Sequence, residues 1–75
     1  MKEYELIREI FNECSRNQMR DVFISEIETD DIDKVVKEYT VGTVVTCEKT
    51  VVNDVTTVYD TVVDGIKQRL TFTEI

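Results

Sequence analysis

Residues 57–72, TVYDTVVDGIKQRLTF, decide the fold, because a strong turn signal lies at their centre. Asp64-Gly65 is typical of a two-residue hairpin turn of the primed type, in which both central residues take a positive φ. The segments on either side are rich in valine, threonine and aromatic residues, which favour strands. The resulting register pairs Val63 with Ile66, Tyr59 with Leu70, Thr57 with Phe72 and, on the other face, Asp60 with Arg69.

The two faces of this hairpin differ in polarity. One face carries large apolar side chains and is predicted to face the core. The other face alternates threonine and valine with charged groups and is expected to face solvent. Its small apolar patch at Val58 and Val62 is also a candidate contact for a homodimer or another partner. The predicted core face consists of Tyr59, Val63, Ile66, Leu70 and Phe72.

The hairpin before it turns around Asn53-Asp54, and its register depends on the loop length. A two-residue loop would place Val45, Cys47 and Val51 on the solvent side. A three-residue loop at residues 52–54 would place the same side chains on the core face, because a one-residue slip flips every side chain. We choose the three-residue loop, which predicts that Cys47 is buried.

The N-terminal segment, residues 2–16, is predicted to be an amphipathic helix. Its apolar residues recur at spacings of three and four, as expected for one face of a helix. This helix would bury Cys14 as a structural thiol, since free cysteine behaves as a small hydrophobe. The helical stripe is made of Tyr4, Ile7, Ile10, Phe11 and Cys14, widened by Leu6.

Two further elements are predicted between residues 20 and 42. Residues 20–28 form a strand, and Val22-Phe23-Ile24 is apolar on both sides, which favours cover on both sides. A helix follows at residues 31–39, after the start signal Thr29-Asp30 and before Gly42. Its apolar positions are Ile32, Val35, Val36 and Tyr39.

These elements predict a single compact α+β domain over residues 1–75. The expected order is helix, strand, short helix and then a three-stranded antiparallel meander over residues 43–75. The strands would form a four-stranded sheet with both helices on one face. The six aromatic residues fall at core-facing positions of these elements, so they are expected in the core rather than on a binding surface: Tyr4, Phe11, Phe23, Tyr39, Tyr59 and Phe72.

The formal net charge of −7 is concentrated in one segment. Residues 21–33 contain six acidic residues and no lysine or arginine, which sums to −6. One interpretation is structural, since carboxylates cap the start of a helix and lie on the wet side of a strand. The other is a recognition surface that contacts a basic partner through long-range attraction. The candidate partner-binding residues are Glu26, Glu28, Asp30, Asp31 and Asp33.

Several classes of chemistry find no support in the sequence. There is no histidine, the two glycines are isolated, and two cysteines cannot complete a four-ligand zinc site. The acidic segment also lacks the ligand pattern of an EF-hand loop. We therefore expect no catalysis, no cofactor and no metal ion. The dispersed basic residues argue against direct nucleic-acid binding.

The functional expectation is a small, acidic, non-catalytic interaction domain that binds a basic protein surface. An alternative is an acidic inhibitor, of the phage-associated kind, that mimics nucleic acid and occupies the site of a DNA- or RNA-handling protein. A third is a structural dimerisation module using Val58 and Val62. No signal-peptide pattern or membrane span is found in the sequence, so a cytoplasmic location without membrane association is expected.

Overall fold

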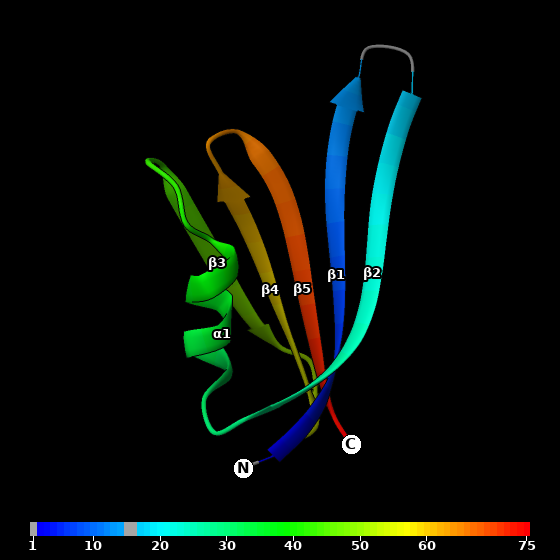
Figure 1. Cartoon of the computed structure of the whole chain (residues 1–75), viewed down its shortest axis with the longest axis vertical. Helices are drawn as coiled ribbons and strands as arrows, with labels where there is room; N and C mark the ends of the chain where they lie inside the picture. The colour runs from blue at the N-terminus through cyan, green and yellow to red at the C-terminus, as the bar shows by residue number, and fades with distance from the viewer. Residues whose placement is uncertain (1, 15–16) are drawn as a thin grey trace.

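The computed structural model describes residues 2–14 and 17–75, with side chains described for 2–11 and 21–75. These residues form one five-stranded antiparallel sheet in the order β2-β1-β5-β4-β3, with one helix lying across one face (Figure 1). No helix in the described part has the length and hydrophobicity to cross a bilayer. The elements are β1 (Lys2–Cys14), β2 (Asn17–Thr29), α1 (Ile32–Tyr39), β3 (Val45–Val51), β4 (Thr56–Val63) and β5 (Ile66–Glu74).

The predicted fold class is wrong, because the N-terminal segment is a strand and not a helix. β1 pairs with β2 on one side and with β5 on the other, so it lies in the middle of the sheet. The domain is therefore mostly a five-stranded antiparallel sheet with a single short helix among its described residues, instead of two helices on four strands. Cys14 lies in β1, but its side chain is outside the described set, so its predicted burial stays a prediction.

The sequence of β1 also contains the alternating pattern of a strand, in the same residues that fit a helical spacing. Tyr4 and Leu6 alternate with Glu3 and Glu5, which is the two-residue period of a strand. Leu6 is 1% exposed and belongs to the core, whereas Ile7 lies on the other face of the sheet. The apolar residues of β1 thus lie on both faces of the sheet. Their combined spacing in the sequence resembles that of one apolar face of a helix.

The hairpin of β4 and β5 forms as predicted. Asp64 has a φ of 49° and Gly65 a φ of 87°, and Val63 pairs directly with Ile66. The predicted cross-strand pairs are confirmed. On the core face Tyr59, Leu70 and Phe72 are buried, but Val63 is only half-buried and Ile66 is 52% exposed, because both lie at the turn end, beyond the cluster that α1 covers.

The predicted loop between β3 and β4 is too short. Val51 pairs with Thr57 and β4 begins at Thr56, so residues 52–55 form the loop. The side chain of Asn53 accepts hydrogen bonds from the backbone N–H groups of Val55 and Thr56, both at 2.9 Å. The register moves by two residues, which keeps Cys47 on the predicted face. Its predicted burial is nevertheless wrong, because every residue of the edge strand β3 is exposed.

Helix α1 forms nearly as predicted and covers the middle of the sheet. Asp31 is its N-cap, accepting a hydrogen bond from the backbone N–H of Asp33 at 3.0 Å. Val36 of the helix belongs to the same buried cluster as Phe72, whose ring meets that of Tyr59 edge-on at 5.6 Å. The core cluster is Leu6, Val36, Tyr59, Leu70 and Phe72, with Tyr4, Ile27, Ile32, Val35 and Tyr39 partly buried against it.

β2 is a strand as predicted, but it is not covered on both sides. It is an edge strand, and its apolar triplet is open to solvent: Val22 is 46% exposed, Phe23 54% and Ile24 69%. The core cluster beneath α1 has Ile27 of β2 packed against it but none of the triplet. The prediction that Phe23 lies in the core is therefore wrong.

The β4–β5 turn also holds the connection between α1 and β3. The carboxylate of Asp64 accepts hydrogen bonds from the backbone N–H groups of Thr43, at 3.1 Å, and Val44, at 2.8 Å. The backbone N–H of Asp64 in turn donates to the carbonyl of Val44 at 2.8 Å. This contact brings Gly42 against the turn without room for a side chain.

We predict that Gly42→Ala destabilises the domain. A Cβ at this position would lie 2.5 Å from Cγ1 of Val63 and 2.8 Å from a carboxylate oxygen of Asp64, so the turn would have to shift. Overpacking of this kind costs about 1–3 kcal/mol, which urea unfolding would detect. Val41→Ala, at the neighbouring 81%-exposed position, is the matched control and should change the free energy of unfolding little. Equal stability of the two variants would contradict the prediction.

Candidate functional site

The clearest candidate site is a group of four carboxylates on the face of the sheet that α1 leaves open. In the register of β1 and β2, Glu3 lies opposite Glu28 and Glu5 opposite Glu26. Directly opposite residues of an antiparallel pair have Cβ atoms about 5 Å apart. All four residues are exposed. We call Glu3, Glu5, Glu26 and Glu28 the acidic face.

The core positions fix which way these carboxylates point. Tyr4 and Ile27 pair with each other and pack against the core cluster beneath α1. Successive side chains of a strand point to opposite sides, so the glutamates on either side of Tyr4 and Ile27 point away from the helix. The acidic face is thus a direct consequence of the strand period of β1 and β2.

The acidic face is not neutralised by the rest of the described chain. Among the described side chains, those of residues 2–11 and 21–75, no lysine or arginine forms an ion pair with any of its four carboxylates. Like charges placed directly opposite each other destabilise a sheet by a few tenths of a kcal/mol or more per pair. Two like-charge pairs, Glu3–Glu28 and Glu5–Glu26, therefore lie on an open surface.

Apolar side chains continue the same face beyond the glutamates. Ile7 pairs with Ile24 two residues along the register from the Glu5–Glu26 pair, and Ile24 is 69% exposed. On the other side of Ile7 lies Thr71 of β5. The open face thus carries four exposed carboxylates next to an exposed apolar side chain.

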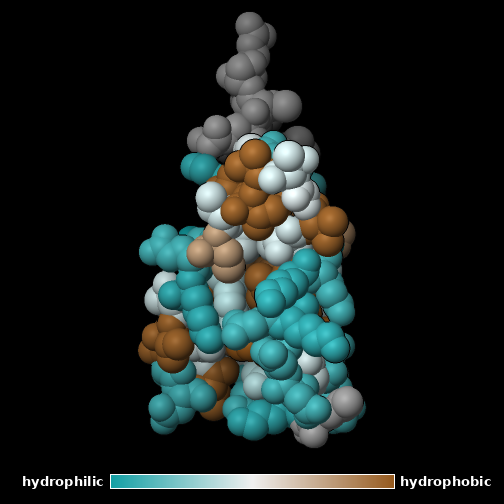
Figure 2. Space-filling model, turned by 90° about the vertical axis from the view of Figure 1, so that its left-hand side faces the viewer, coloured by the Kyte–Doolittle hydropathy of each residue, from teal (hydrophilic) through white to brown (hydrophobic). Residues whose placement is uncertain are grey.

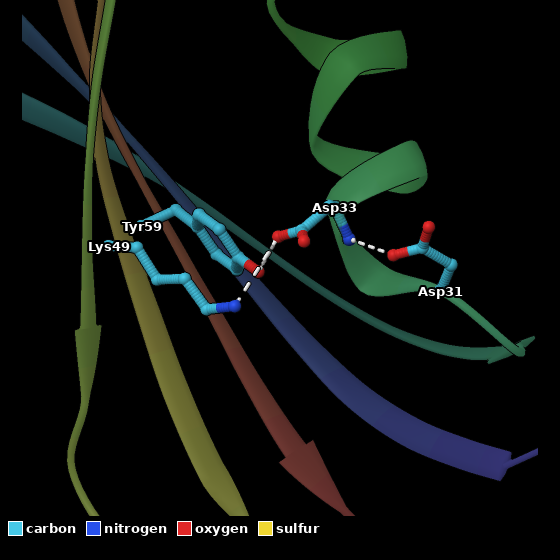
Figure 3. Close-up of polar contacts among 4 residues, drawn as sticks. All are labelled: Asp31, Asp33, Lys49 and Tyr59. Atoms are coloured by element: carbon cyan, nitrogen blue, oxygen red, sulfur yellow. Dashed lines mark hydrogen bonds and ion pairs between the residues drawn. The ribbon is translucent and has the colours of Figure 1, made fainter.

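The structure divides the predicted acidic segment between two places. Glu26 and Glu28 belong to the acidic face, while Asp31 and Asp33 lie at the start of α1, and Asp30 connects the two. The carboxylate of Asp31 caps the helix (Figure 3). The structural interpretation thus describes the contacts of Asp31 and Asp33, and the surface interpretation concerns Glu26 and Glu28.

Asp33 joins three elements at the start of the helix. Figure 3 shows its carboxylate pointing at the hydroxyl of Tyr59 on β4, which donates a hydrogen bond to it. Nζ of Lys49, on β3, lies 3.6 Å from the same carboxylate oxygen and 5.7 Å from the centre of the Tyr59 ring. These contacts hold the first turn of α1 on the sheet.

The same contacts shift the ionisation of this cluster. Burial and the hydrogen bond to Asp33 raise the pKa of Tyr59 far above its ordinary value. The Tyr59 hydroxyl and Lys49 lower the pKa of the Asp33 carboxyl. Partial desolvation of the sulfur and the charge of Asp33 raise the pKa of Cys47, so its thiol stays protonated at neutral pH and is a poor nucleophile. The arrangement stabilises neutral and paired groups and provides no activated nucleophile.

A second polar cluster holds the other end of α1. Nε of Arg8 donates to Oε1 of Gln68 at 2.8 Å, and Nε2 of Gln68 donates to the backbone carbonyl of Tyr39 at 3.4 Å. The guanidinium carbon of Arg8 lies 4.9 Å from the ring centre of Tyr39 and 5.8 Å from that of Phe23. A cation beside the last turn of a helix is favoured by the helix dipole.

The second predicted interface, Val58 and Val62, lies on the open face as its register implied. Both residues are half-buried on β4, where Val58 lies between Thr50 and Thr71, and Val62 between Thr46 and Lys67. Figure 2 shows how mixed the side of the molecule bearing β3 is, with hydrophilic groups over much of it and apolar groups at several places. Among the described residues, no three or more cysteine, aspartate or glutamate side chains are arranged to hold a metal ion.

Sequence reasoning missed half of the acidic face. The predicted helix over residues 2–16 separates Glu3 and Glu5 from Glu26 and Glu28, which the charge count identifies. The alternation Glu3-Tyr4-Glu5-Leu6 was the signal that would have placed all four together. No family model matches this chain, and the searches of curated proteins and of solved structures gave no significant match.

Proposed function

We propose that this chain is a small, non-catalytic interaction domain that binds a basic protein surface through the acidic face. The observation that carries the proposal is the register that sets Glu3 opposite Glu28 and Glu5 opposite Glu26 with no cation from the described chain between them. A basic partner would relieve both repulsive pairs on binding. The repulsion between the paired glutamates destabilises the free domain, and its relief on binding would stabilise the complex.

The expected binding is salt-dependent and partly apolar. Exposed carboxylates attract a basic surface over about one Debye length, which is roughly 10 Å at 0.1 M salt. They accelerate encounter more than they increase affinity. Ile24, which is 69% exposed beside Glu26, supplies apolar contact area once the partner has docked.

The test is a double variant that removes the charge of the face while improving the fold. Glu5→Lys with Glu28→Lys turns both like-charge pairs into opposite-charge pairs, since Glu3 and Glu26 would each lie opposite an introduced lysine. We expect the free energy of unfolding to rise by about 0.5–2 kcal/mol. Binding of a fluorescent oligolysine peptide at low salt should weaken by about tenfold or more.

The matched control changes the net charge equally at other places. Glu38→Lys with Asp54→Lys also raises the net charge by four units, at exposed residues on α1 and in the β3–β4 loop. This control should retain most of the peptide binding. Equal losses in the two double variants would show that only the overall charge matters, and unchanged binding in the Glu5/Glu28 variant would contradict the proposal outright.

A further inference from the structure

The outer edge of β2 is the longer of the two outer strand edges of the described sheet. β2 runs over Asn17–Thr29, pairs only with β1, and is the outermost strand on its side of the sheet (Figure 1). Its middle, Val22-Phe23-Ile24, exposes three consecutive large apolar side chains at 46%, 54% and 69%. A long apolar edge with unpaired backbone groups is a template for pairing with another strand.

We propose that a second copy of this chain pairs with β2 in antiparallel orientation, about a two-fold axis that passes beside Phe23. The axis is perpendicular to the sheet, so each residue meets a partner on the same face. Phe23 then meets Phe23, Val22 meets Ile24, and Asp21 meets Ser25. The result is one continuous sheet across both copies.

Charge complementarity selects both the occupant and the register. The register centred on Phe23 sets Glu26 opposite position 20, an arginine in the sequence, once on each side of the axis. Three apolar pairs in the middle are followed on each side by an Asp21–Ser25 pair and then by one pair of opposite formal charge, which favours pairing. The edge is therefore complementary to itself.

The two neighbouring registers, with the axis beside Val22 or Ile24, pair charged and apolar side chains less favourably. Centring the axis on Ile24 sets Val22 opposite Glu26 and Asp21 opposite Ile27. Centring it on Val22 sets Asp21 opposite Phe23. Each of these places a carboxylate against a large apolar side chain, which desolvates the charge without pairing it.

The proposed dimer shares two residues with the surface proposed for the basic partner, because it sets Glu26 opposite position 20 and Ile24 opposite Val22, whereas Glu3 and Glu5 of β1 lie outside the contact. A two-fold axis perpendicular to the sheet keeps both helices on one side and both acidic faces on the other. A basic partner with two sites would then bind both copies, which increases the avidity. The dimer itself rests on the edge of β2 alone.

Sedimentation velocity of the full chain at about 0.1 mM tests the proposal, with an expected mass of twice 8.8 kDa. Phe23→Lys places two lysines against each other at the axis and should give a monomer. Because the new charge also lies beside Arg8, whose guanidinium carbon is 5.8 Å from the centre of the Phe23 ring, circular dichroism checks that the fold is kept. Ile24→Lys is a second variant with the same expected effect. Val41→Lys, at an 81%-exposed position after α1, is the matched control and should leave the dimer intact.

A charge exchange tests the register. Glu26→Arg sets like charges at both flanking pairs and should raise the dissociation constant of the dimer about tenfold, while Arg20→Glu with Glu26→Arg should restore it. A monomeric wild-type chain, a dimer that survives Phe23→Lys, or an exchange that fails to restore the affinity would each overturn the proposal. Peptide binding is tested at Glu5 and Glu28, so either proposal can fail without the other.

Discussion

Replacing Phe72 with alanine is expected to destabilise the domain by about 3–5 kcal/mol. The Phe72 side chain is fully buried, and its ring meets those of Tyr4 and Tyr59 edge-on at 6.4 and 5.6 Å. Removing it leaves a cavity between the sheet and Val36 of α1. A domain of this length has a total stability of roughly 4–11 kcal/mol, so the variant would lose much or all of it.

Urea unfolding followed by circular dichroism measures the loss. Phe11→Ala is the matched control, because Phe11 is only half-buried and lies on the open face of β1, where Arg69 approaches its ring at 6.0 Å. Its replacement should cost much less than that of Phe72. A loss below about 1 kcal/mol for Phe72→Ala would show that the core does not centre on this ring.

Alkaline pH is expected to destabilise the domain through Tyr59. The pKa of Tyr59 is raised in the folded state by burial and by its hydrogen bond to Asp33. Its contribution is therefore fully present below about pH 10, where an unfolded tyrosine ionises, and is lost as the pH rises above that value. Because one proton is involved, the loss has a limit of about 1.4 kcal/mol per pH unit.

Tyr59→Phe isolates this effect from that of the other titrating groups. The variant loses the hydrogen bond to Asp33, which we expect to cost about 1 kcal/mol at neutral pH because Asp33 is partly exposed. Above pH 10 its stability should fall less steeply than that of the wild type. Parallel pH profiles of the two proteins would contradict the assignment, as would a Tyr59 absorbance titration near pH 10.

The part of the fold that local chemistry determines could be predicted from the sequence. The turn at Asp64-Gly65 requires two positive φ values, which few other dipeptides tolerate, so the β4–β5 register followed directly. The short helix α1 was likewise marked by its apolar spacing and by the start signal Thr29-Asp30, one residue before the observed N-cap, Asp31. Both signals are contained within a few residues.

The rest of the fold depends on partners that are distant in the chain. Tyr4, Leu6, Ile7 and Phe11 suit one face of a helix as well as two faces of a central strand, and only the pairing with β5 decides between them. Exposure was misjudged for a similar reason. Whether Phe23 or Cys47 is covered depends on how far one short helix extends over five strands, which the local pattern does not encode.

The candidate site was predictable only in part. The charge count identified Glu26 and Glu28, but Glu3 and Glu5 join them only when residues 2–14 form a strand. The count also included Asp31 and Asp33, whose carboxylates are engaged at the start of α1. A concentration of charge along the sequence therefore overlaps with, but does not equal, a charged surface in space.

The pairing of β1 with β5 has a consequence for how the chain folds. It brings together segments far apart in the chain, from Tyr4 opposite Glu74 to Phe11 opposite Lys67. Leu6 comes from one segment, and Leu70 and Phe72 from the other, so neither hairpin holds a complete core by itself. Closing such a large loop before any burial makes folding slow, on the scale of milliseconds to seconds for sheet topologies of this kind, and makes it an all-or-none event.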